Sequence, residues 1–236
     1  MERGQPPITL SLLDGFELCC DREIVHLPMS AQRLLACLAL HDRPLPRPYV
    51  AAMLWLDSSD ARAAANLRSA LWRLHQPGYR LIETDDTRLR LSSDLRVDVR
   101  DLLTLAHRLI DGSGDWEDVD VDSTLLVGEV LPDWYEDWVL IQRERFRKLS
   151  LHALEALAAH LTEAGRLGDA LEAALAAVSR DPLRESAHCA LINVHLAEGN
   201  GGEALRQFRF CRRLLADRLG IAPSPRLKAL VRNLPV

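Results

Sequence analysis

The amino-acid sequence predicts an α+β region followed by an all-α region. Three observations support this fold class. The chain opens with short β-rich segments separated by turn residues, which is typical of a β-meander. Apolar residues then recur at helical spacing. Towards the C-terminus a pattern repeats after 34 residues, which is the period of tetratricopeptide helix pairs.

The composition is that of an ordinary globular protein. The chain has 236 residues, of which 48% are hydrophobic and 27% charged, enough for one large or two modest domains. It contains no apolar run of about 18 residues and no apolar leader at its start, so we expect neither a membrane span nor a signal peptide. The five cysteines include no CxxC pair, which predicts reduced, buried thiols in a cytoplasmic protein rather than disulfides or a metal site.

The charge is distributed unevenly along the chain. Residues 1–110 have no net charge, whereas residues 111–137 contain ten acidic side chains and no basic one. Residues 138–236 carry a net charge of +5. The overall charge of −5 therefore arises in one short segment and does not exclude an anionic partner elsewhere.

The N-terminal region is expected to contain three strands and three helices. The strands are ITLSLL, FELCC and EIVHL. Ser30 is the predicted N-cap of the first helix, which the prolines of HDRPLPRP end. A second, short helix contains Tyr49 and ends near Trp55. Asp60 then follows at a position suited to capping a third helix.

The third helix, residues 61–76, has two distinct faces. Its apolar stripe covers about one third of the helical wheel and consists of Ala63, Leu67, Ala70, Leu71 and Leu74. The opposite face and its flanks carry Arg62, Ala65, Asn66, Arg68, Ser69, Trp72 and Arg73. QPG ends the helix, and YRLIET-DD-TRLRLS then predicts a hairpin over residues 79–91. Its second strand alternates Leu89 and Leu91 inward with Arg88 and Arg90 outward.

A strand meander, three helices and a hairpin in this order predict a winged helix-turn-helix. An α-helix fits the major groove of DNA, where Arg62 or Arg73 can bind guanine and Asn66 can bind adenine. Arg88 and Arg90 are suited to phosphate contacts that position the domain. The predicted DNA-binding residues are Arg62, Asn66, Arg68, Ser69, Trp72, Arg73, Arg88 and Arg90. The competing interpretation is that these arginines are a solvated surface and that another domain covers Trp72.

The second region, residues 98–236, begins with a helix in VRDLLTLAHRLI, for which Asp98 or Asp101 is the expected cap. The acidic segment that follows is too apolar at TLLVGEVL to be a simple linker, and we expect it to pack back onto the protein. The alternative is a solvated linker. The first region then spans residues 1–97.

A long helical pattern runs from Trp134 to His160, and the repeat follows it. EAGRLGDALEAALAAV and AEGNGGEALRQFRFCR superpose at the 34-residue offset, with Gly165 and Gly199 at the turns inside each helix pair. DPLRESAH, with Pro182, starts the next helix, and LGIAPSPRLKALV closes the array with a short one. Stacked pairs of this kind bury apolar stripes between neighbours and offer a groove to partners.

Several of these segments resemble a known family. VLPDWYEDWVLIQRERFRKLSLHALEALA, residues 130–158, closely resembles the bacterial transcriptional activator domain, as do DPLRESAHCALINVHLAEGNGGEALRQF and LLADRLGIAPSPRLKALV. AAMLWLDSSDARAAANLRSALWRL looks like the second and third helices of an OmpR-type winged helix. The whole arrangement is similar to that of the streptomycete antibiotic regulatory proteins (SARPs).

The resemblance implies a cytoplasmic transcription factor, usually an activator, and often one that controls a biosynthetic gene cluster such as one for antibiotic biosynthesis. It implies binding to direct repeats in promoters by side-by-side protomers, and recruitment of RNA polymerase. It assigns the recognition helix to residues 61–76 and the wing to residues 79–91, with a junction at Gly78 that is shorter than in many relatives. No GxxxxGKS/T motif occurs, so no nucleotide switch or other cofactor is expected.

Two other classes of function compete with this interpretation. An enzyme is disfavoured because no G-x-S-x-G or HExxH motif occurs. The HxxE pairs His152–Glu155 and His160–Glu163 lie on a single predicted helix, so they predict no metal site. A protein-interaction scaffold without DNA binding is the alternative that the zero net charge of residues 1–110 supports.

Overall fold

The computed structural model describes residues 8–75, 79–113 and 124–234. They form two compact units. The first contains Met1–Asp101 and Gly128–Phe146, and the second contains Leu102–Val127 and Arg147–Val236. The expected domain boundary between residues 97 and 98 stays a prediction. Among the described helices, none is both long enough and apolar enough to cross a membrane.

The first unit contains a four-stranded sheet in the order β3-β2-β1-β7. The predicted meander is confirmed as β1 (Ile8–Ser11), β2 (Glu17–Cys20) and β3 (Glu23–Ile24), paired antiparallel. Strand β7 (Leu95–Val97) was not predicted and pairs parallel to β1. Because β7 has three residues and its partner lies more than eighty positions earlier, local sequence patterns do not reveal it.

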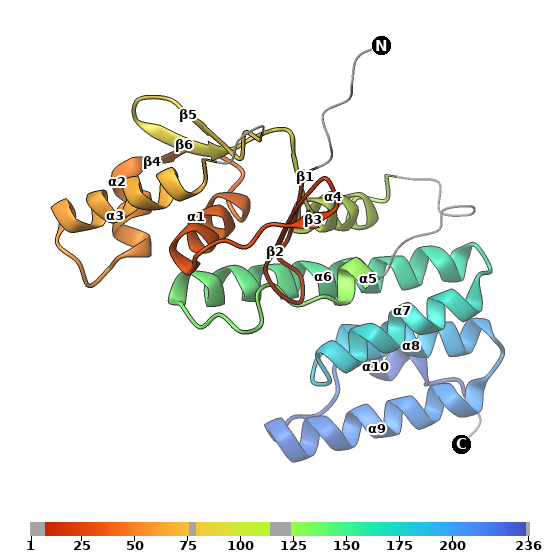
Figure 1. Ribbon diagram of the computed structural model, residues 1–236. Coiled ribbons are helices and arrows are strands. Elements are labelled where there is room, and N and C mark those ends of the chain that lie inside the picture. The colour runs from red at the N-terminus through yellow and green to blue at the C-terminus, as the bar shows by residue number, and fades with distance from the viewer. Residues whose placement is uncertain (1–7, 76–78, 114–123, 235–236) are drawn as a thin grey trace, which may run out of the picture. The chain divides into compact units, whose positions relative to one another are not determined.

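The predicted helix-turn-helix is confirmed, with shifted ends (Figure 1). It comprises α1 (Met29–Ala39), α2 (Arg47–Leu54) and α3 (Asp60–Arg73). The predicted caps Ser30 and Asp60 are wrong, because both lie inside their helices, behind Pro28 and Ser59. Neither Pro28 nor Ser59 makes a side-chain capping bond.

The end of α3 also differs from the predicted residue 76. Helix α3 ends at Arg73, and the amide of Leu74 donates to the carbonyls of both Ala70 and Leu71, a tightening that is common in last turns. The predicted short junction at Gly78 lies outside the described residues.

The predicted hairpin is confirmed as β5 (Ile82–Thr84) and β6 (Arg88–Leu91). The short strand β4 (Leu45–Pro46) pairs with β6 on its other side, so the wing is a three-stranded sheet. Leu89 and Leu91 are buried while Arg88 and Arg90 are exposed. At the turn, the Asp85 carboxylate accepts from the amides of Thr87 (2.8 Å) and Arg88 (2.6 Å), as in an Asx turn.

Part of the acidic segment packs back onto the protein, as predicted. In the first unit Val130 forms a bridge with Leu13, and Val130 and Leu131 are buried. The Arg143 guanidinium donates to the carbonyls of Val130 (2.9 Å) and Trp134 (2.8 Å), which holds this segment in place. Residues 114–123, the most acidic part, lie outside the described residues.

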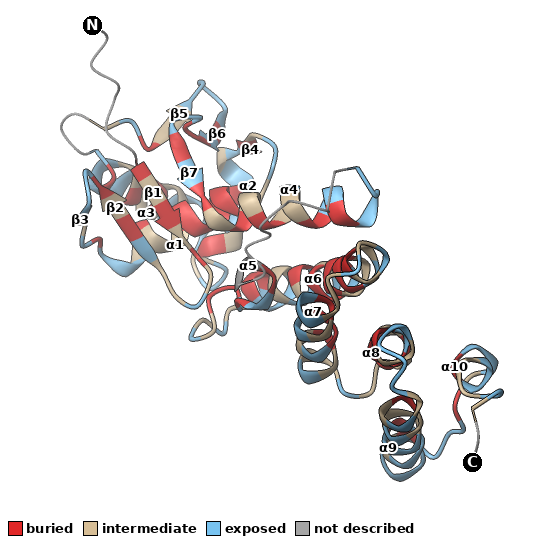
Figure 2. Cartoon of the chain, turned by 90° about the vertical axis from the view of Figure 1, so that its right-hand side faces the viewer, coloured by how far each residue is buried: buried red, intermediate tan, exposed pale blue. Residues whose placement is uncertain are grey.

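Paired helices make up the second unit, as the 34-residue repeat predicts. Figure 2 looks nearly along α7, α8 and α9, whose buried faces meet their neighbours. Gly165 and Gly199 have φ of 75° and 72°, the left-handed conformation that glycine adopts without strain. The helices are α4 (Asp98–Ile110), α5 (Thr124–Val127), α6 (Asp137–Glu163), α7 (Leu167–Arg180), α8 (Glu185–Ala197), α9 (Gly201–Leu219) and α10 (Pro225–Leu230), of which α4 and α6 each begin in the first unit.

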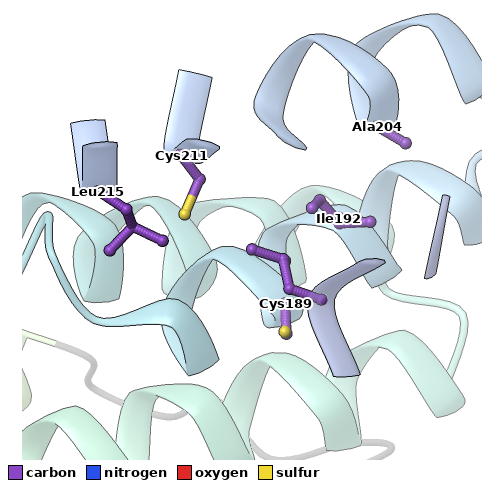
Figure 3. Packing of buried hydrophobic residues seen from close by; sticks show 6 residues of the cluster. Cys189, Ile192, Ala204, Cys211 and Leu215 are labelled. Carbon is purple, nitrogen blue, oxygen red and sulfur yellow. The ribbon is translucent and has the colours of Figure 1, made fainter. Parts of the chain in front are cut away.

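The core between α8, α9 and α10 contains two of the cysteines (Figure 3). Cys189 and Cys211 pack with Ile192, Leu215 and Leu227. All five cysteines are free thiols, and all except Cys19 are buried. Burial raises the pKa of the Cys37 and Cys211 thiols to about 12, which makes them inert. The predicted burial of the thiols is thus confirmed for four of the five positions.

Candidate nucleic-acid interface

Helix α3 separates an apolar face from a polar one. Ala63, Leu67, Ala70 and Leu74 are buried against the rest of the first unit, and Leu71 is half-buried. Asp60 in the first turn and Arg73 in the last have the signs that the helix dipole favours. Burial of the apolar stripe fixes the rotation of the helix, so the opposite face must lie in solvent.

The predicted contact residues on α3 do share this outer face. Arg62, Arg68, Ser69 and Arg73 are exposed, while Asn66 is half-buried. Trp72 is 79% exposed, so within the first unit nothing covers this large ring.

Two side chains of the face make contacts inside the protein. The Ser69 hydroxyl donates to the Ala65 carbonyl at 3.1 Å, which leaves its oxygen as an acceptor towards solvent. The Arg73 guanidinium donates to the Ser30 hydroxyl of α1 at 3.3 Å. Arg62 and Arg68 make no hydrogen bond or ion pair with any described residue, so their donors are available to an external acceptor.

The two predicted arginines of the wing, Arg88 and Arg90, differ in their contacts within the protein. The Arg90 guanidinium Nε donates to a Glu83 carboxylate oxygen on the neighbouring strand at 2.7 Å, and a second nitrogen donates to the same oxygen. These bonds lower the pKa of Glu83. The side chain of Arg88 has no hydrogen bond or ion pair to the described part of the chain. Arg88 can therefore bind a phosphate directly. Arg90 must first give up its hydrogen bonds to Glu83.

Two further arginines, which sequence patterns did not single out, lie beside the wing. A hollow of about 480 Å³ is lined by the end of α3 and by the wing, with Arg47 and Arg80 at its walls. A second hollow of about 290 Å³ joins Arg80 to Arg88 and Arg90. Arg80 belongs to the segment YRLIET but precedes β5, so the alternation along the strand does not reveal it. Arg47 lies far from the wing in the sequence, and only the folded structure brings it to the wall of the first hollow.

The histidine–glutamate pairs have structural roles. In the second unit Glu155 accepts from the Arg184 guanidinium at 2.6 Å and from the Ser186 hydroxyl at 2.7 Å. His160 bonds to the Leu109 carbonyl at 2.9 Å. Among the residues that the structure describes, no three His, Cys, Asp or Glu side chains gather as a metal site would need.

Comparison with protein families identifies the C-terminal part. Residues 123–234 match the bacterial transcriptional activator domain. This range contains α5 to α10 and thus the helix pairs of the second unit. No curated protein sequence matches the chain.

Comparison with solved structures extends the likeness to the N-terminal part. The fold is similar to that of Mycobacterium tuberculosis EmbR in complex with a low affinity phosphopeptide, with a TM-score of 0.74 and 23% sequence identity. The match covers 98% of this chain and 66% of that chain, so the present chain spans just under two thirds of its length. The predicted order, a winged helix followed by helical repeats, is confirmed. Residues 123–234 therefore belong to the bacterial transcriptional activator domain, and the fold of the chain, a winged helix followed by helical repeats, is similar to that of EmbR.

Proposed function

We propose that the chain is a cytoplasmic, sequence-specific DNA-binding activator that controls a biosynthetic gene cluster. In this proposal α3 enters the major groove, and the wing lies on the adjacent phosphate backbone. Two protomers occupy neighbouring direct repeats of a promoter and recruit RNA polymerase. The bacterial transcriptional activator domain supports the regulatory role, and no catalytic role is proposed.

One observation carries the DNA-binding part of the proposal. The outer face of α3, held in solvent by its buried stripe, combines free arginine donors with an amide and a hydroxyl. Arginine and asparagine are the side chains that make bidentate contacts to guanine and adenine in the major groove. The arginines of the wing lie within the same unit and add the phosphate contacts that orient such a helix.

The alternative function is a protein-interaction scaffold that does not bind DNA. It is favoured by the zero net charge of residues 1–110 and by the pairing of Arg90 with Glu83, because many DNA-binding domains are plainly basic. The two functions differ in how binding to DNA depends on salt.

Genome-wide mapping of bound promoters, followed by affinity measurements on those fragments, tests the proposal. We expect enrichment at promoters with direct repeats, and an affinity that falls steeply between about 50 and 200 mM salt. Substitution of Arg62 by Ala should reduce the preference for these promoters over arbitrary DNA. Absence of any enriched promoter, together with a flat salt dependence, would establish the scaffold instead.

A further inference from the structure

The solvent face of α9 is lined by arginines. Arg206, Arg209, Arg212 and Arg213 form, with Gly202, a hollow of about 350 Å³. We call these four residues the arginine face. Three of them, Arg206, Arg209 and Arg213, recur at the i, i+3 and i+7 spacing that aligns side chains along one side of a helix. The opposite side of α9 is buried through Ala204, Cys211 and Leu215, so the stripe is held outward.

Few carboxylates neutralise the arginine face. Arg206 forms an ion pair with Glu203 at 2.7 Å, whereas Arg209, Arg212 and Arg213 have no hydrogen bond or ion pair within the described chain. From Gly201 to the C-terminus, the sequence contains eight basic and two acidic side chains. Like charges at helical spacing destabilise a helix slightly, so Arg209, Arg212 and Arg213 do not stabilise α9 itself.

The lining of the hollow indicates the chemistry of its partner. It contains guanidinium groups and one glycine, with no apolar residue. Protein–protein interfaces have a largely apolar core, whereas interfaces with DNA are polar and strongly positive. The face also lacks the mixture of amide and hydroxyl groups found on α3, so it is suited to phosphates rather than to base edges.

We propose that the arginine face binds the phosphate backbone of duplex DNA independently of base sequence. Arg206 and Arg213 lie about 10 Å apart along the helix axis, at 1.5 Å per residue, which is roughly three steps of a DNA strand at 3.4 Å each. This second contact depends on one part of the proposed function, namely that the protein binds DNA. It would add affinity and salt dependence but no sequence preference.

The test compares two double variants of the full chain on a short duplex of arbitrary sequence. Arg209→Gln with Arg213→Gln removes two phosphate contacts, so the slope of log affinity against log salt should fall by about 1.8, at about 0.9 per contact. Arg218→Gln with Arg232→Gln is the matched control, because it removes the same charge from exposed positions of the same unit outside the hollow. Circular dichroism and thermal midpoints verify that both variants fold.

An unchanged slope in the first variant, or an equal loss in the control, overturns the proposal. The proposal is also overturned if the Arg209→Gln, Arg213→Gln variant loses binding to an acidic peptide while its binding to DNA is intact. The arginine face would then be a protein-docking surface. Promoter fragments separate this inference from the proposed function. If the wild-type chain shows no promoter preference but its salt slope depends on Arg209 and Arg213, the proposed function fails and the arginine face stands. If Arg62→Ala removes the promoter preference and the Arg209→Gln, Arg213→Gln variant leaves the salt slope unchanged, the proposed function stands and the arginine face fails.

Discussion

The carboxylate of Asp98 accepts hydrogen bonds from the backbone amide of Leu12, at 2.9 and 3.0 Å to its two oxygens. One of these oxygens also accepts from the amide of Leu13 at 3.0 Å, and the other from Val99 at 2.7 Å. Asp98 is the first residue of α4 and follows β7 directly. One side chain thus ties the end of β1 to the start of a helix that lies 86 residues further along the chain.

Replacing Asp98 by Ala should destabilise the first unit. The substitution leaves the partly buried amides of Leu12 and Leu13 without acceptors, and each unsatisfied group costs about 1–3 kcal/mol. Burial also raises the pKa of Asp98, against the effect of these hydrogen bonds. Urea unfolding measures the loss. The control is Asp94→Ala, an exposed carboxylate, which should change the free energy of unfolding by less than about 0.5 kcal/mol. Equal effects of the two substitutions would refute this role.

Arg73→Ala should relax sequence preference and cost about 1–3 kcal/mol of binding free energy, if this arginine reads a base. Because Arg73 also donates to Ser30, Ser30→Ala serves as the control for positioning and should have a smaller effect. Footprinting and affinity measurements on a bound promoter give both values. An unchanged footprint with Arg73→Ala would remove this residue from the recognition face.

Arg90→Ala should weaken binding to all DNA sequences alike, because a phosphate contact carries no base information. Glu83→Gln should have the opposite effect, since it releases Arg90 from its carboxylate partner. We expect Glu83→Gln to raise affinity uniformly and to steepen the salt slope, as measured by anisotropy on arbitrary DNA. The control is Asp94→Asn, which removes the same charge nearby. Unequal effects on different sequences would show that Arg90 reads bases.

The Glu83–Arg90 pair also predicts a pH dependence. The hydrogen bond from Arg90 holds the pKa of Glu83 below its usual value, so the folded state favours the carboxylate. The pair therefore contributes stability above the unfolded-state pKa, and this contribution is lost as pH falls through the lower folded-state pKa. An NMR titration of the Glu83 carboxyl should give a depressed midpoint, which Arg90→Gln should return towards the ordinary value. A midpoint that does not move would contradict the assigned cause.

The thiols should react slowly in the folded protein. A pKa of about 12 for Cys37 and Cys211 leaves roughly one thiolate in 10⁴ molecules near pH 8, and burial blocks access. Titration with a chromogenic disulfide should label Cys19 first, because it is the one partly exposed cysteine. The other four should react at the rate of unfolding. Rapid reaction of all five in the native protein would mean that the cores open readily.

Local patterns in the sequence determined much of the fold. The alternation of Leu89 and Leu91 with arginines predicted the wing, because a strand places successive side chains on opposite faces. The stripe through Leu67 likewise predicted the orientation of α3. These inferences were confirmed because periodicity depends only on local backbone geometry. Helix ends were predicted less well, as Ser30 and Asp60 show, because the observed N-caps Pro28 and Ser59 make no side-chain capping bond that a sequence pattern could reveal.

The sequence by itself therefore determined the order of the elements, the winged helix and the paired helices, and which faces are polar. Tertiary structure alone decided that Arg90 is paired while Arg88 is free, that Arg47 joins the wing, and that β7 completes the first sheet beside β1. The physical reason is separation along the chain. A periodic pattern can be recognised within about ten neighbouring residues. Contacts between side chains that are distant in the sequence form only after folding has brought their segments within a few ångströms of each other.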